Sequence, residues 1–262
     1  MSSTWNLHWL GVGNASAVEL GSASAVLERD GEPILMIDCG QEALTAYLAR
    51  YGEAPRAVFI THTHLDHVGG MERLFVKLYF DPQRRGDCRL LVPSRLVPWL
   101  QQRIADYPGV LAEGGVNYWD AFHLVPHTRG FWHQGLWFDV FEVRHHEPGT
   151  AFGLGLRGSF IYTGDTRPIP EVLLNLGTGH ELIAHDCGLI GNPSHSGIDD
   201  LQREYPPALL ARLWLYHYGS QAEREALQQR GQRVLQSGQN LALAVPDEPM
   251  TGADAHFHEN PR

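Results

Sequence analysis

The chain is organised around one stretch of eight residues, Thr61-His62-Thr63-His64-Leu65-Asp66-His67-Val68. An apolar run at 57–60 precedes it and indicates a buried strand, while Gly69-Gly70 opens a helix expected over 69–80. Imidazole and carboxylate are the ligands that zinc and similar divalent ions take. His62 and His64 project to the same side of an extended segment, whereas Asp66 and His67 lie past the bend and can face a second point nearby. The spacing therefore suits two metals better than one.

The alternative is that these are surface histidines, since the chain has 15 histidines and several stand alone. A solvated loop has no reason to gather three imidazoles and a carboxylate directly after an apolar strand, so we favour the metal site. At this point the sequence resembles the metallo-β-lactamase fold, whose signature H-x-H-x-D-H is matched at every fixed position. The resemblance spans residues 5–245 and implies an αββα sandwich, in which two mixed sheets pack face to face with helices outside.

Length and composition indicate a globular protein. The chain has 262 residues, 43% of them hydrophobic, and no low-complexity linker, so we expect residues 1–262 to form a single domain. The formal net charge of −10 disfavours a general nucleic-acid surface. Cys39, Cys88 and Cys187 form no C-x-x-C pattern, which favours reduced thiols in a cytosol. Without a long apolar run or an export signal, we expect a cytoplasmic protein that does not enter a membrane.

The expected elements alternate between strand and helix. Strands at 5–10, 22–27 and 34–37, with a hairpin at Asp30-Gly31, precede a helix at 41–51. A strand at 88–92 and a helix at 94–104 continue an α/β pattern. Further strands are expected at 136–143, 152–156, 159–162, 181–184, 213–216 and 241–245, and helices at 199–213, interrupted by Pro206-Pro207, and from Ser220 onward. Residues 105–135 are rich in aromatics and histidines without clear periodicity, which fits a substrate lid or wall as well as ordinary core.

The resemblance also implies the remaining metal ligands. One histidine is expected shortly before a glycine that begins a strand; Gly153 matches the glycine, and we favour His146 over His145 for the ligand. Thr163-Gly164-Asp165-Thr166 matches the motif of a bridging aspartate, and His217 follows an apolar strand as the last ligand does. His62, His64, His146 and Asp165 would then hold one ion, and Asp66, His67, His217 and the shared Asp165 the other. Asp38 matches an aspartate that supports the metal loop.

Two further residues resemble the ribonuclease Z-like branch of the fold. Asp186 follows a buried strand and His195 lies in the next loop, where that branch has an acid and a histidine near the leaving group. Asp186 replaces a glutamate and Gly197 a threonine, so a structural hydrogen-bonded pair stays an alternative. The basic arm with which ribonuclease Z grips tRNA is missing. His256 and His258, in the tail, are not expected to be ligands.

The resemblance implies a hydrolase with two divalent ions, Zn²⁺ or else Mn²⁺ or iron, bridged by an attacking hydroxide. Asp66, Asp186 and His195 are the expected catalytic residues, with Asp66 also a ligand. The expected substrate is a small or cyclic nucleotide-type phosphodiester rather than tRNA. The same centre opens lactones, thioesters and β-lactams, and a non-enzymatic metal- or ligand-binding protein is the third reading. The sequence leaves a homo-oligomer open.

Overall fold

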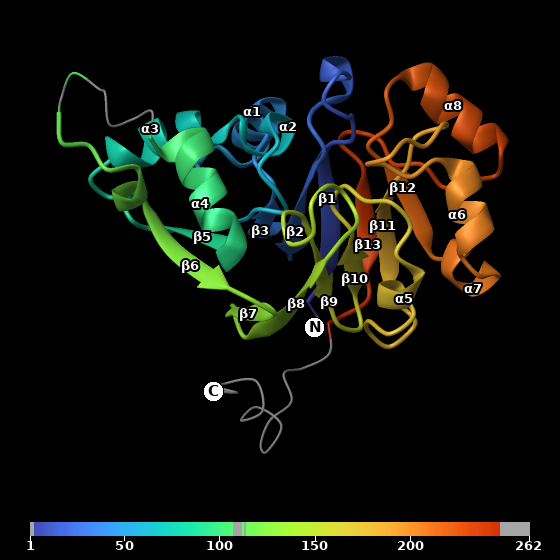
Figure 1. The fold of residues 1–262 in the computed structure, drawn as a ribbon. Helices are drawn as coiled ribbons and strands as arrows, with labels where there is room; N and C mark the ends of the chain where they lie inside the picture. The colour runs from blue at the N-terminus through green and yellow to red at the C-terminus, as the bar shows by residue number, and fades with distance from the viewer. Residues whose placement is uncertain (1–2, 107–111, 113, 247–262) are drawn as a thin grey trace.

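The computed structural model describes residues 3–106, 112 and 114–246, and within them the chain forms two mixed β-sheets that pack face to face (Figure 1). The first has seven strands in the order β13-β1-β2-β3-β4-β5-β6, and the second has six in the order β12-β11-β10-β9-β8-β7. The first sheet comprises β1 (Trp5–Gly11), β2 (Ser24–Arg29), β3 (Glu32–Ile37), β4 (Ala57–Phe59), β5 (Cys88–Pro93), β6 (Phe122–His127) and β13 (Asn240–Leu243). The second comprises β7 (Gly130–His133), β8 (Leu136–Glu142), β9 (Phe152–Leu156), β10 (Phe160–Tyr162), β11 (Leu182–Asp186) and β12 (Leu213–Tyr216).

Helices cover both sides of the sheet pair (Figure 1). On the side of the first sheet lie α1 (Gln41–Tyr51), α2 (Leu65–Val68), α3 (Met71–Tyr79) and α4 (Val97–Leu100), which continues into a π-helical turn at Gln101–Ala105. On the side of the second lie α5 (Pro170–Leu173), α6 (Ile198–Glu204), α7 (Pro207–Leu210) and α8 (Gln221–Gln229). Short 3₁₀ turns occupy Val18–Leu20, Ser94–Leu96 and Tyr118–Ala121. The expected αββα sandwich is confirmed.

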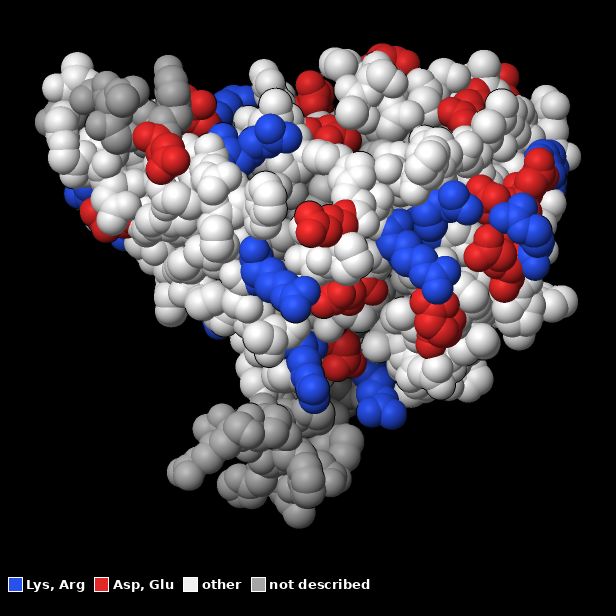
Figure 2. All heavy atoms as spheres, in the orientation of Figure 1, with Lys and Arg blue, Asp and Glu red and all other residues white. Residues whose placement is uncertain are grey.

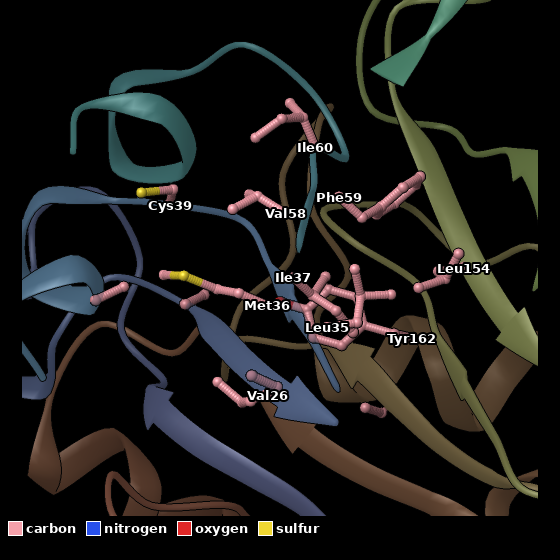
Figure 3. Close-up of a cluster of buried hydrophobic side chains, with 14 of the residues drawn as sticks. Val26, Leu35, Met36, Ile37, Cys39, Val58, Phe59, Ile60, Leu154 and Tyr162 are labelled. Carbon is pink, nitrogen blue, oxygen red and sulfur yellow. The ribbon is translucent and has the colours of Figure 1, made fainter. Parts of the chain in front are cut away.

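The core lies between the two sheets, where apolar side chains of both meet. Trp9 of β1 stacks on Tyr162 of β10 with ring centroids 5.6 Å apart and lies 5.0 Å from the ring of Tyr216 of β12. Side chains from β3 and β4 meet those from β9 and β10 in the same layer (Figure 3). Because parallel strands with both faces covered read as continuous apolar runs, the short strands β4, β10 and β12 were recognisable in the sequence.

Most expected elements form within a few residues of their predicted bounds, including the hairpin, where Asp30 and Gly31 have φ of 55° and 85°. Three expectations need correction. The helix expected over 69–80 begins at Met71, and a separate turn of helix, α2, carries Asp66 and His67. The helix expected over 94–104 is a succession of 3₁₀, α and π turns. Part of the unassigned stretch 105–135 is regular, since β6 and β7 pair at sheet edges.

Over the residues described, no helix is both apolar and long enough to span a bilayer. His256 and His258 lie outside the described residues.

Candidate metal centre

The candidate site lies at one edge of the sandwich, where strands of both sheets end. β10, β11 and β12 run parallel, and β8 points the same way because β8 and β10 are both antiparallel to β9. Their carboxyl ends therefore reach one edge. Asp186 is the last residue of β11, and the segments that follow β8, β10 and β12 carry His145, Asp165 and His217. β4 of the first sheet delivers the loop 60–67 to the same place.

Three groups of side chains share Asp165 and could each hold a metal ion; the third, Asp165, Asp186, His195 and His217, overlaps the second. The ligand atoms of each group all lie within 4.8 Å of one another. The first group is His62, His64, His145 and Asp165, and the second is Asp66, His67, Asp165 and His217. One carboxylate oxygen of Asp165, Oδ2, lies 3.6 Å from His62 Nε2 and 3.3 Å from Nε2 of both His67 and His217. Asp165 is thus the point at which the first two groups meet.

Asp165 reaches this position because of the residue before it. Gly164 has φ of 65°, and a Cβ there would lie 2.9 Å from the carbonyl oxygen of Phe152. Only glycine combines this left-handed backbone with so close an approach. The turn therefore brings the carboxylate under the loop 61–67, where it is 1% exposed.

Asp38 supports the metal loop from beneath, as the resemblance implied. Its carboxylate accepts hydrogen bonds from the backbone nitrogen of Thr61 at 2.8 Å and from the Thr61 hydroxyl at 2.7 Å. His67 Nδ1 donates to the same carboxylate at 2.7 Å, which leaves Nε2 of His67 facing Asp165. Asp38 has φ of 61° and His217 has φ of 70°, so two residues of the site adopt a conformation that side chains rarely take.

The structure places His145, rather than the expected His146, in the first group. The His145 ring is buried, its Nε2 lies 3.2 Å from His64 Nδ1 and 3.8 Å from Asp165 Oδ2, and its Nδ1 donates to the carbonyl oxygen of Ser194 at 3.0 Å. His146 is exposed and contacts the outer edge of His64 instead, with the two Nε2 atoms 3.1 Å apart. The backbone after β8 turns inward one residue earlier than the sequence spacing suggested.

Asp186 and His195 form a pair beside the second group. Asp186 is fully buried, its Oδ2 accepts from His195 Nδ1 at 2.8 Å, and its Oδ1 lies 3.4 Å from His217 Nδ1. The backbone nitrogen of Thr166 also donates to Asp186 at 2.8 Å. Because Nδ1 of His195 is bonded to Asp186, Nε2 is the nitrogen left for a ligand. A cavity of about 350 Å³ is lined by His195 together with Asp66, Asp165 and His217.

The electrostatics of the site reflect burial and the shared carboxylate. Burial lowers the pKa of His62 well below its ordinary value and that of His145 to about 4, so both rings are neutral, as ligands must be. Burial opposes charge on His217 too, but Asp165 and Asp186 raise its pKa to about 10. Burial also opposes charge on Asp165, yet His217 and His67 hold the pKa of this carboxyl well below its usual range.

The unpaired atoms fit a pair of metal ions. Among the described residues, Nε2 of His62, His67 and His217 and both carboxylate oxygens of Asp165 are buried without a hydrogen-bond partner. Buried polar atoms are normally paired, so five unpaired atoms aimed at one another need a ligand to satisfy them. Imidazoles, which bind metal once they are deprotonated, and carboxylates around two nearby points are the donor set of a dinuclear transition-metal site.

The fold and this centre define a metallo-β-lactamase-fold protein. The chain superposes on the metallo-β-lactamase fold protein YhfI of Bacillus subtilis with a TM-score of 0.71 at 12% identity, over 91% of this chain and 99% of that one. It superposes equally well on a diphosphatase from the PhnP family, with a TM-score of 0.71 at 18% identity over 93% of this chain and 100% of the other. The chain thus has the fold of a metallo-hydrolase.

Within that class the chain belongs to the Anti-Pycsar protein Apyc1 family, whose model matches residues 5–241. An Anti-Pycsar protein Apyc1 of Saccharibacillus brassicae is 32% identical over 230 residues, which cover 84% of this chain and 92% of that protein. The Apyc1 of Bacillus phage 010DV004 is 26% identical over 249 residues, covering 85% of this chain and 92% of the relative.

Sequence reasoning missed other residues at the site. Asn14 and Ser16, from the turn after β1, line the cavity that holds His195. Trp99 and Arg103 border a second cavity beside His62 and His64. Neither pair belongs to a motif, and only the folded chain brings them to the centre.

Proposed function

We propose that this protein hydrolyses a small phosphodiester of the cyclic nucleotide type with the help of two divalent metal ions. The observation that carries the proposal is the position of His195, which Asp186 orients and which lines one cavity with Asp66, Asp165 and His217. A proton donor beside a candidate dinuclear centre is what the departure of an alkoxide requires.

The ligands in this proposal follow the first two groups. His62, His64 and His145 with Asp165 would hold one ion, and Asp66, His67 and His217 with Asp165 the other. Zinc fits the donor set, as manganese and iron do, because first-row ions share these ligands. When bound, such ions neutralise phosphate charge and lower the pKa of water toward neutrality.

The chain's own residues supply orientation and a proton. Asp38 fixes the ring of His67, and the Ser194 carbonyl fixes that of His145. Hydrolysis adds water across one P–O bond, so the leaving oxygen must gain a proton. Nε2 of His195 is placed to give it, and Asp186 stabilises the ring while it is charged.

A small substrate suits the site better than a polynucleotide. The cavity of about 350 Å³ falls in the range of small-molecule sites. Basic side chains are interspersed with acidic ones on the face seen in Figure 2 rather than forming a continuous band. With a formal charge of −10, this surface is a poor match for a phosphate backbone. Two fold neighbours are named a PhnP-family diphosphatase and human tRNase Z, and both names refer to the cleavage of a P–O bond, which agrees with the reaction class.

The test compares substrates and leaving groups. Metal-loaded protein should convert a 3′,5′-cyclic nucleotide to the monophosphate, followed by ³¹P NMR, and should open lactones and β-lactams far more slowly. Preferred lactone cleavage would make it an acyl hydrolase, and no turnover with intact metal content would favour a binding protein.

His195→Ala should keep its metal and slow the hydrolysis of alkyl diesters about 10²–10⁴-fold, the usual value of a general acid. Nitrophenolate leaves without a proton, so the loss on a nitrophenyl diester should be much smaller. Equal losses on both substrates would assign His195 to positioning or structure, and loss of metal would make it a ligand.

A further inference from the structure

A second cavity, of about 480 Å³, lies beside the metal loop and is not used by the reaction described above. One wall is the segment His62-Thr63-His64, a second is the turn that carries His146, and the third is formed by Trp99 and Arg103 of α4 and its π-helical turn. The two histidines of the metal loop connect this cavity directly to the candidate centre. A π-helical turn is uncommon and frequently lies at a functional site.

Trp99 is presented to this cavity by the packing of its helix. Leu96, Leu100 and Ile104 recur every four residues and are buried, so they fix the opposite face against the core. Trp99 is 50% exposed. Among the described residues its ring has neither a stacked aromatic nor a cation over it, so both faces are available to a ligand. The indole ring is therefore accessible to a ligand, and it lines the same cavity as His62 and His64 of the metal loop.

Arg103 is the second unusual residue of this wall. Its Nε donates to the carbonyl oxygen of Thr63 at 3.2 Å, between the two ligands of the metal loop. Within the part of the chain that the structure describes, no carboxylate forms an ion pair with it, whereas Arg95 and Arg144 pair with Glu142 and Glu171. Because this guanidinium lies beside the metal loop without a carboxylate partner, its remaining N–H groups are available to an anionic ligand in the cavity.

We propose that Trp99 and Arg103 form a nucleotide subsite, in which the indole stacks on the base and the guanidinium holds a phosphate oxygen. The proposal rests on the phosphodiester reaction above and adds to it what recognises the substrate. Base–aromatic stacking tolerates every base because each has a π face, so this subsite would select nucleotides from other diesters without choosing among bases.

The experiment separates the two residues by substrate. One substrate is a 3′,5′-cyclic nucleotide, and the other is methyl riboside 3,5-cyclic phosphate, which has the same ring but no base. Trp99→Ala should raise the KM of the nucleotide about 10-fold, which is the expected loss for one stacked base. The KM of the base-free diester should not change. Arg103→Ala should raise KM about 10-fold for both, because both carry the phosphate, and Arg103→Lys should restore part of that loss.

Trp132 is the matched control, since it is an exposed tryptophan at 37% on β7, away from both cavities. Trp132→Ala should change neither KM. Equal effects of Trp99→Ala on the two substrates, or no effect on either, would overturn the subsite while leaving the phosphodiester reaction in place.

A binding measurement keeps the inference independent of turnover. Titration calorimetry with a nucleoside 5′-monophosphate should give a Kd about 10-fold weaker for Trp99→Ala than for the wild-type chain. If the wild-type chain hydrolyses no diester, the proposed reaction fails, yet this binding difference still decides on the subsite. Equal affinities, or no binding by the wild-type chain, would reject it.

Discussion

Two buried carboxylates lie at opposite ends of the same strand pair, β10 and β11, and they differ in their hydrogen-bond partners. Glu181 precedes β11, and its oxygens accept five hydrogen bonds, from the backbone nitrogens of Gly158, Thr178, Gly179 and His180 and the Thr178 hydroxyl. Asp165 follows β10, and among the described residues neither of its oxygens has a hydrogen-bond partner. Both side chains are 1% exposed or less.

The difference distinguishes a structural carboxylate from a functional one. A buried charge left without hydrogen bonds costs several kcal/mol unless something else satisfies it. At Glu181 the chain provides those partners from its own backbone. At Asp165 it provides four imidazoles from three separate segments, all with nitrogens 3.3–3.8 Å away. The first arrangement completes the fold, and the second leaves room for ions.

The largest expected effect follows from replacing the shared carboxylate. Asp165→Asn should reduce bound transition metal from about two equivalents per chain to fewer than one, because both groups lose their common ligand. Elemental analysis of protein purified without chelator measures it. Glu181→Gln is the matched control and should keep its metal. Full metal occupancy in Asp165→Asn would remove Asp165 from the centre.

The second effect concerns which of two adjacent histidines completes the first group. His145→Ala should weaken metal binding by more than about 10²-fold, the upper value for losing an outer partner of a ligand, whereas His146→Ala should stay within about 10-fold of the wild-type chain. Competition with a chromophoric chelator gives both affinities. The opposite result would restore His146 as the ligand and make His145 its buried support.

This pair shows where prediction from sequence stops. The loop 61–67 is contiguous, so its own alternation decides which side chains face the centre. His145 and His146 are equivalent in composition, and only the burial of one ring, set by the Ser194 carbonyl 49 positions away in sequence, distinguishes them. Asp165, Asp186, His195 and His217 could be located because each follows an apolar strand or lies in the loop after one.

The fold was predictable for a similar reason. Buried strands such as β10 and β12 are continuous apolar runs, and turn residues mark where these runs begin and end. β6 and β7 were missed because Pro126, His123 and His127 interrupt the alternation, and both strands lie at sheet edges where polar residues are tolerated. Trp99 and Arg103 gave no signal, because an exposed side chain acquires its neighbours only from the tertiary structure.

The third effect tests the structural carboxylate. Glu181→Gln replaces the charged acceptor with an amide whose NH₂ group faces backbone donors, so the free energy of unfolding at pH 7 should fall by about 1.5–3 kcal/mol. Backbone hydrogen bonds from Thr178 and Gly158 outweigh burial and lower the pKa of Glu181 from 4.5 to about 2. Because the pKa of Glu181 is lower in the folded than in the unfolded state, its charge stabilises the fold at pH values above the unfolded pKa. That contribution is lost as the pH falls toward the folded pKa.

The pH dependence of this stability difference tests whether the charge of Glu181 causes it. Urea denaturation at pH 7 and pH 3 should show the difference between Glu181→Gln and the wild-type chain shrink to roughly half at the lower pH. A difference that is constant with pH would mean that the substitution acts through packing rather than through the charge.

The smallest effect separates the backbone of Ser194 from its side chain. The carbonyl oxygen accepts from His145, whereas the hydroxyl lies 3.2 Å from Nδ1 of the exposed His146. Ser194→Ala removes only the second contact, so metal affinity should be unchanged and the free energy of unfolding should fall by no more than about 0.5 kcal/mol, as for a partly exposed polar contact. The same competition assay and urea curves measure both. A loss of metal comparable to that of His145→Ala would show that the His146 contact, and not the buried ring, positions this side of the centre.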